Sequence, residues 1–256
     1  MKRPEKQAPC AHERMCTVTW SAGQTGYTLL FNRDEQLSRG PAFPPEERSR
    51  GGVRFICPLD PDGGGTWLGV NEYGLTVGIL NYYSAEVSPE DHAGGRVSRG
   101  LLVLSLMDAP DLDEVARRLE GKQKEYYSPF LLFGAEVGGR RIAWRWDGRE
   151  FRQDRDPALP LSTSGYEPED VVRFRRELLE RFRGDDGGVT VDTLRAYHSF
   201  HDPERPGYSV SMRREEAQTV SFAEITVDRE EVSFSYTDGF PAQGTPLPTV
   251  GIPRRG

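Results

Sequence analysis

The sequence predicts an α+β protein in which helices cover the outer faces of stacked antiparallel β-sheets. Runs that alternate between apolar and polar residues fill most of positions 16–82 and return at the C-terminal end. Segments with apolar residues at helical spacing lie between these two groups of strands. Short turns rich in glycine separate the first strands, which is typical of an antiparallel meander.

The first strands are expected where β-rich runs end at turn residues. Gly63–Gly65 and Glu72–Gly74 supply two of these turns. The expected strands span residues 16–20, 27–32, 53–57, 66–71 and 75–82.

The later elements alternate between helices and strands. Amphipathic spacing predicts helices over residues 97–107, 112–119, 169–182 and 190–200. Gly138–Gly139 predicts a hairpin turn between strands 130–137 and 140–146. Two more strands are expected over residues 218–227 and 231–236, and the tail after Gly239 is expected to be irregular.

Composition excludes several functional classes. The formal charge is −7 and no basic stripe stands out, so we expect no nucleic-acid partner. No apolar run approaches the ~18 residues that span a bilayer, and the first 14 residues lack the apolar core of a signal peptide. We therefore expect no membrane insertion and a cytoplasmic location. Three cysteines are too few for a disulfide scaffold.

The N-terminal segment differs in composition from the rest of the chain. The first 14 residues are polar, and the β-rich run begins after Met15. We interpret residues 1–15 as a flexible leader or a mis-assigned start, and residues 16–256 as a single domain. The sequence leaves homo-oligomer formation open.

Cys16 is the residue that most strongly indicates chemistry. Removal of Met15 would leave it as an N-terminal cysteine that carries a nucleophile and a base together. An α-amine titrates near ~7.7–8.0, so its neutral fraction can accept the thiol proton at neutral pH. The alternative is an ordinary buried cysteine on a first strand.

Two polar motifs come after Cys16 at strand ends. The first is Asn32-Arg33-Asp34-Glu35, and the second begins at Gly65-Thr66-Trp67 and ends at Asn81. Taken alone, the first motif predicts a turn capped by Asn and Asp, and the second predicts a hairpin. Together with Met15-Cys16 they make the chain resemble the NRDE family, also called the transport and Golgi organisation family.

A second resemblance lies further along the chain. The stretch Tyr208–Arg213, with Thr219–Ser221 and Gly239–Pro241, resembles the C-terminal signature of isopenicillin N acyltransferase-type cysteine enzymes. These enzymes and the choloylglycine hydrolases are N-terminal-nucleophile hydrolases. The two resemblances imply a four-layer αββα sandwich of two stacked antiparallel sheets.

The resemblance also implies roles for individual residues. Cys16 matches the nucleophile, Asp34 the aspartate that holds its amine, and Asn81 an asparagine that donates to the oxyanion. Arg33 matches a nearby arginine, although the relatives separate this arginine from the aspartate by two residues. Thr163 stands where relatives carry an asparagine that would give a second donor.

The C-terminal signature adds one more candidate. Arg213 matches a second active-site arginine, and Arg214 beside it is an equal rival. Ser211 and Ala242 replace cysteines that acyltransferase-type relatives often have, which removes no expected catalytic group.

Metal and nucleotide sites are not expected. Cys10, His12 and Cys16 lack a fourth zinc ligand, and we interpret His198, near His201 and Asp202, as a helix-dipole contact. Glycines 63–65 lack the helix and lysine of a phosphate loop. We expect no cofactor.

Three functional hypotheses remain open. The leading one is an N-terminal-cysteine amidohydrolase or acyltransferase that acts through a thioester on a small-molecule acyl-amide or acyl-lipid substrate. The second is a non-catalytic carrier that holds haem, an acyl-lipid or acyl-CoA in the same pocket. The third is a scaffold with a vestigial site, which the presence of Cys16, Asp34 and Asn81 argues against.

Overall fold

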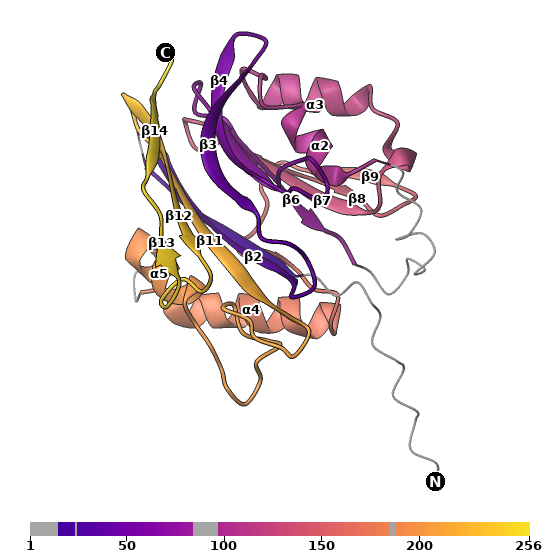
Figure 1. The fold of residues 1–256 in the computed structure, drawn as a ribbon, viewed down its shortest axis with the longest axis vertical. Coiled ribbons are helices and arrows are strands. Elements are labelled where there is room, and N and C mark those ends of the chain that lie inside the picture. The colour runs from indigo at the N-terminus through magenta and orange to yellow at the C-terminus, as the bar shows by residue number, and fades with distance from the viewer. Residues whose placement is uncertain (1–14, 24, 84–96, 185–187) are drawn as a thin grey trace.

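The computed structural model describes residues 15–23, 25–83, 97–184 and 188–256. Within these residues two seven-stranded antiparallel sheets stack face to face, and helices cover the outer face of each (Figure 1). This arrangement confirms the predicted four-layer αββα class. None of the described helices is long and apolar enough to cross a membrane.

The first sheet joins the N-terminal strands to the C-terminal ones. Its central strands run in the order β10, β1, β2, β11 and β12, with β13 and β14 both paired to β12. Their bounds are β1 Cys16–Ala22, β2 Tyr27–Gln36, β10 Leu161–Thr163, β11 Ala217–Val227, β12 Glu231–Asp238, β13 Thr245–Pro246 and β14 Val250–Pro253.

The second sheet keeps the chain order from β3 to β9. Each strand pairs with its predecessor, as the predicted meander requires. Their bounds are β3 Phe43–Arg50, β4 Val53–Leu59, β5 Leu68–Asn71, β6 Thr76–Asn81, β7 Phe130–Ala135, β8 Arg141–Trp146 and β9 Phe151–Asp154.

Two pairs of helices form the outer layers. Helices α2 Arg99–Leu104 and α3 Leu112–Glu120 lie beside the second sheet, and α4 Pro168–Phe182 and α5 Val191–His198 lie beside the first (Figure 1). Apolar side chains from both inner faces and from α2 and α3 form one large core, while α4 and α5 close a smaller one against β2.

The expected elements are present, with five strands that the sequence did not predict: β3, β9, β10, β13 and β14. β3 and β9 are the edge strands of the second sheet, and β10 is an edge strand of the first. β14 corrects the prediction of an irregular tail, because Val250–Pro253 pairs with β12. The helix expected over 97–107 is shorter, and spans Arg99–Leu104.

Candidate active site

The Asn32-Arg33-Asp34-Glu35 motif divides its side chains between the two faces of β2. Arg33 and Glu35 point to the inner face, where Arg33 lies over the Trp67 ring, and Asn32 and Asp34 point to the helix layer. Arg33 therefore faces away from its neighbour Asp34. Every side chain of the motif is buried.

Cys16 shares the inner face with Arg33 and Thr163. Its Cα pairs with that of Arg33 on one side and with that of Thr163 on the other. Directly paired residues of antiparallel strands project to the same face, with Cβ atoms about 4.5–5.5 Å apart. Arg33 and Thr163 are thus the lateral neighbours of the Cys16 thiol. Thr163 Oγ1 is buried without a hydrogen-bond partner.

Asp34 lies on the opposite face of β2, beside the residue that precedes Cys16. Its backbone N–H donates to the carbonyl oxygen of Met15 at 3.0 Å. Its Oδ1 accepts from Thr219 Oγ1 at 2.6 Å, whereas its Oδ2 has no hydrogen-bond partner. The same face buries Met15 among side chains of α4 and the strand region near β11.

A β-bulge in β11 makes the Asp34–Thr219 contact. Thr219 pairs with Asp34 and Ser221 pairs with Arg33, so Val220 is the extra residue between them. Such a bulge re-aims neighbouring side chains. It turns the Thr219 hydroxyl to the helix layer, while Ala223 and Ile225 further along β11 keep their place in the core between the sheets.

Arg175 of α4 is the buried cation that balances Asp34. Its Nη2 lies 3.7 Å from Asp34 Oδ2, and both side chains are fully buried. The guanidinium also donates to Thr17 Oγ1 at 2.7 Å, to Ser162 Oγ at 3.2 Å and to the carbonyl oxygen of Ser209. These contacts tie α4 to β1 and β10 behind Cys16.

Sequence reasoning missed Arg175, although the sequence carries a signal for it. The residue lies four positions after Val171 and three and four positions before Leu178 and Leu179, all of which are buried. A charge within the apolar stripe of an amphipathic helix is expected to have a buried partner.

Arg213 and Arg214 do not lie in the site that contains Cys16. Arg213 lines a separate small hollow and packs over the Phe240 ring at 4.3 Å. Arg214 pairs with Glu216 and lies over the Tyr166 ring. The prediction that Arg213 is an active-site arginine is therefore corrected by its placement. Arg175 of α4 pairs with Asp34, and Arg33 of β2 is the cross-strand neighbour of Cys16.

His198 is a structural residue of the helix layer. Its ring nitrogens contact Thr19 Oγ1 and Asn32 Oδ1, each at 2.9 Å. Burial lowers the pKa of His198 to about 3, so its ring is neutral. His198 is the last residue of α5, at the helix end where the sequence placed it. Asn32 also donates to the carbonyl oxygens of His198 and Val210, which anchors α5 to β2.

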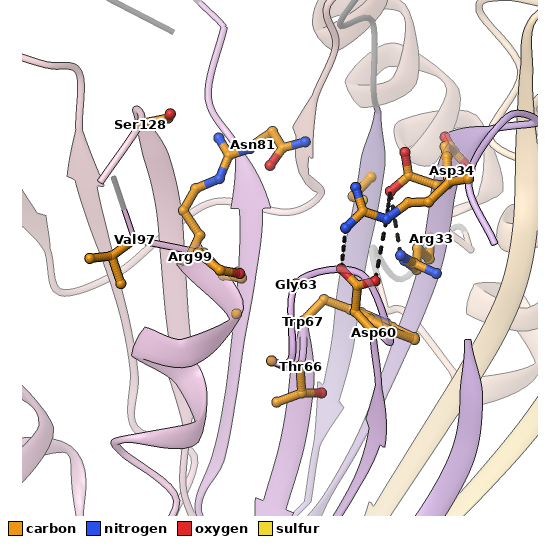
Figure 2. A pocket seen from close by; sticks show the side chains of 17 residues that line it. Arg33, Asp34, Asp60, Gly63, Thr66, Trp67, Asn81, Val97, Arg99 and Ser128 are labelled. Atoms are coloured by element: carbon orange, nitrogen blue, oxygen red, sulfur yellow. Dashed lines mark hydrogen bonds and ion pairs between the residues drawn. The ribbon is translucent and has the colours of Figure 1, made fainter. Parts of the chain in front are cut away.

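Cys16 borders a cavity of about 300 Å³. Figure 2 shows side chains that line this cavity. Arg33 and Asp60 lie on one side of this cavity, and Asn81 and Arg99 lie on the other. Charged and polar side chains predominate in its lining, which comprises Cys16, Arg33, Asp34, Glu35, Arg39, Asp60, Gly63, Gly65, Thr66, Trp67, Ile79, Asn81, Val97, Ser98, Arg99, Gly100 and Ser128.

Asn81 ends strand β6 in the wall of this cavity. Its Nδ2 donates to Tyr83 Oη at 3.0 Å. A side-chain amide has two N–H donors, so a second hydrogen remains for a ligand. The predicted site residues Cys16, Arg33, Asp34 and Asn81 all line one cavity, and Thr163 lies directly beside Cys16.

The glycine turn at residues 63–65 forms another wall of the cavity. A Cβ atom on Gly65 would lie 2.3 Å from the backbone carbon of Gly100, so only glycine permits this close approach of the turn to α2. Strand β5 comes after the turn instead of a helix, in agreement with the expectation that it is no phosphate loop.

The described residues contain no group of three or more histidine, cysteine, aspartate or glutamate side chains arranged to hold a metal. Cys10 and His12 of the rejected zinc motif lie outside the described residues.

Burial sets the acidity of both described cysteines. Burial and, to a lesser extent, the negative charge of Asp34 together raise the pKa of Cys16 to about 12. Burial also raises the pKa of Cys57, to about 11. With Met15 attached, Cys16 is therefore a protonated thiol at neutral pH. It differs from Cys57 in that it borders the cavity, whereas Cys57 is fully enclosed.

Access to the cavity should make Cys16 the faster thiol to alkylate. With iodoacetamide at pH 8, we expect the peptide that contains Cys16 to be modified before the peptide that contains Cys57. Peptide mass spectrometry over a time course measures both rates, and a Cys57→Ala variant controls for overlapping signals. Equal or faster labelling of Cys57 in the folded protein would contradict the assignment.

Comparisons with known proteins agree with this architecture. The family model described as Transport and Golgi organisation 2 matches residues 15–195. A search of curated proteins finds no match.

Solved structures of acylases and amidases are similar over most of the chain. Penicillin V acylase from Agrobacterium tumefaciens is 14% identical with a TM-score of 0.52, over 93% of this chain and 86% of that one. A Caenorhabditis elegans N-acylethanolamine-hydrolyzing acid amidase ortholog is 11% identical with a TM-score of 0.56, over 83% and 92%. A mutant of conjugated bile acid hydrolase from Clostridium perfringens is 11% identical with a TM-score of 0.53, over 93% and 92%.

At these identities the likeness shows the fold alone, which is the predicted four-layer sandwich of two stacked antiparallel sheets. The family model covers more than half of the sequence and includes Cys16, the Asn32–Glu35 motif, Asn81 and Thr163. The chain belongs to the Transport and Golgi organisation 2 family.

Proposed function

We propose that the protein is an N-terminal-cysteine amidohydrolase or acyltransferase that cleaves a linear amide or related acyl bond through a thioester on Cys16. The observation that carries this proposal is the arrangement around Cys16. The thiol borders a cavity with Asn81 in its wall, and Asp34 lies beside the peptide bond that precedes the cysteine.

The mature chain in this proposal consists of residues 16–256. The carbonyl oxygen of Met15 accepts from the Asp34 N–H, so an amine on Cys16 would lie next to the Asp34 carboxylate. Asp34 Oδ2 is buried without a hydrogen-bond partner, and a buried acceptor left unsatisfied is costly. A charged α-amine on Cys16 would satisfy it.

A free amine would also change the acidity of the site. Burial raises the pKa of Asp34 to about 7 in the chain that carries Met15, despite the opposing charge of Arg175. A positive charge placed between Asp34 and the thiol lowers the pKa of both groups. Exposure of the amine therefore converts an inert thiol into a nucleophile.

The positions of these groups define the reaction. The neutral α-amine of Cys16 takes the thiol proton and becomes the ammonium that faces Asp34, and the thiolate Sγ forms a bond to the substrate carbonyl carbon. The carbonyl oxygen becomes an oxyanion, to which Asn81 Nδ2 donates. The carbon–nitrogen bond then breaks as the ammonium returns a proton to the leaving amine. Water, or an acceptor amine, cleaves the remaining thioester and restores the thiol.

Thr163 is assigned a lesser part in this scheme. It pairs with Cys16 and its Oγ1 has no hydrogen-bond partner. Its hydroxyl offers one donor, whereas the asparagine of relatives offers two. Arg213 has no part in the scheme, because it lines a different hollow.

The cavity favours this function over the carrier hypothesis. Three of the described lining residues are large and apolar: Trp67, Ile79 and Val97. Besides Asp34, five lining residues carry a charge: Arg33, Glu35, Arg39, Asp60 and Arg99. Binding sites for apolar ligands are lined mostly by hydrophobic side chains. Haem or a long acyl chain would leave these charges desolvated.

We expect the protein expressed from its native gene to begin at Cys16. Intact-mass measurement of the purified protein, followed by N-terminal peptide sequencing, tests this directly. A Cys16→Ala variant provides the matched chain without a nucleophile and should release no amine from any amide. A protein that keeps residues 1–15 and still hydrolyses amides would contradict the free-amine mechanism.

A further inference from the structure

Arg33 is a buried cation whose donors are mostly unused by the protein. Arg33 is 7% exposed to solvent, and it borders the same cavity as Cys16. Among the described residues it donates one hydrogen bond, from Nη2 to Glu35 Oε2 at 3.4 Å. A guanidinium has five N–H donors, and leaving a buried charge without partners is unfavourable.

Glu35 alone does not balance this cation, because it also faces a second arginine. Its Oε2 lies 3.4 Å from Arg33 Nη2 and 3.7 Å from Arg39 Nε. Both contacts are longer than the 2.7–2.9 Å typical of charge-assisted hydrogen bonds. Arg39 is held separately by Asp60, to which it donates through Nε and Nη2. Arg33 thus retains positive charge toward the cavity.

Trp67 fixes the direction in which Arg33 can bind. The guanidinium carbon lies 4.0 Å from the centroid of the indole ring. A guanidinium held against an aromatic face keeps its N–H groups in its own plane, where they match the two oxygens of a carboxylate. The pair Arg33–Trp67 is therefore shaped for a planar anion.

The nucleophile lies next to this anion-binding group. Arg33 is the cross-strand partner of Cys16, so both side chains enter the cavity from one face of the sheet. The cavity of about 300 Å³ is at the lower end of the range for small-molecule sites. One small molecule can contact both residues at once.

We propose that the substrate is a small amide that carries a carboxylate, which Arg33 binds while Cys16 attacks the amide carbonyl. This inference rests on the proposed function and names its substrate class. The carboxylate belongs either to the leaving amine, as in an N-acyl amino acid, or to the acyl group, as in a mono-amide of a dicarboxylic acid.

The test compares carboxylates with neutral isosteres. The mature enzyme is assayed for amine release from N-acetylglycine and N-acetylglycinamide, and from succinamic acid and its methyl ester. We expect the carboxylate of one pair to have a kcat/KM about 10–100-fold above its neutral counterpart, as one charge-assisted contact implies. The pair that shows the preference identifies which half of the substrate carries the anion.

Variants of Arg33 locate the preference. Arg33→Gln should reduce the preference to within about 3-fold by slowing the carboxylate substrate, whereas Arg33→Lys should retain part of it, since lysine keeps the charge without the planar fork. Arg213→Gln is the matched control, because Arg213 borders a separate hollow, and it should leave the preference unchanged. A preference that survives in Arg33→Gln overturns the inference.

A binding measurement separates this inference from the proposed function. Calorimetric titration of N-acetylglycine and succinamic acid into a Cys16→Ala variant should show binding that Arg33→Gln abolishes in the same background. If no amide is hydrolysed but this binding is present, the hydrolase proposal fails and the carboxylate site stands. If neutral amides are hydrolysed as fast as their carboxylate counterparts, the hydrolase proposal stands and the carboxylate site is wrong.

Discussion

An Asn81→Ala variant is expected to lose acyl turnover by about 10²–10³-fold while its ligand affinity stays nearly unchanged. The amide of Asn81 matters most when negative charge develops on the substrate oxygen. Its loss therefore raises the barrier without weakening the ground-state complex. Steady-state kinetics on the mature enzyme, with ligand titration into a Cys16→Ala/Asn81→Ala variant, measure both quantities.

Tyr83→Phe is the matched control for this variant. It removes the hydroxyl that accepts from Asn81 Nδ2 and keeps the amide itself. We expect turnover within a few-fold of the native enzyme. Slow hydrolysis that is unchanged by Asn81→Ala, together with weakened binding, would favour the carrier hypothesis over the hydrolase.

An Arg175→Met variant is expected to lower the free energy of unfolding by about 3–5 kcal/mol at pH 8. The substitution leaves the Asp34 carboxylate buried without its cation. It also removes the donors to Thr17 and to the carbonyl oxygen of Ser209. Denaturant unfolding followed by tryptophan fluorescence measures the change.

The pH dependence of this loss has a definite sign. In the chain that retains Met15, the folded-state pKa of Asp34 is about 7, above its ordinary value of 3.8, so in that chain its contribution to stability is present at low pH and lost as pH rises through 7. Without Arg175 this pKa rises further, and the loss should be larger at pH 8 than at pH 5.

Two further variants test whether the stability loss in Arg175→Met comes from the buried pair with Asp34. Asp34→Asn in the Arg175→Met background should recover part of the stability, because the buried charge is gone. Arg173→Met lies on the same helix and breaks only an exposed pair with Asp170, so it should cost at most about 1 kcal/mol. Equal losses from Arg173→Met and Arg175→Met would show that the buried pair is not important.

The sequence predicted the elements whose periodicity is strong. The hairpin at Gly138–Gly139 has both glycines at positive φ, and β11 and β12 alternate as expected. β3 escaped prediction because it is an edge strand with two prolines and mostly exposed side chains. β13 and β14 are too short to show a period, so only pairing with β12 defines them.

The sequence also located most of the candidate site, because its residues lie in Met15-Cys16 and in the two motifs that follow it. Cys16, Asp34 and Asn81 line one cavity as expected. The ion-pair partner of Asp34 could not be predicted from a local motif, because Arg175 is 141 positions further along the chain. Only the packing of α4 against the sheet brings the two residues together. Arg213 was assigned by motif similarity, and the structure places it over the Phe240 ring at a separate hollow.

In the proposed mechanism Cys16 is the mature N-terminus and carries the acyl group during turnover. The most direct measurement is intact-mass spectrometry of the native-gene protein, quenched in acid during reaction with N-acetylglycine or succinamic acid. We expect a chain that begins at Cys16, with one acyl group added to the Cys16 peptide and none in a Cys16→Ala variant. Turnover without an adduct on Cys16, by a chain that retains Met15, would contradict this mechanism.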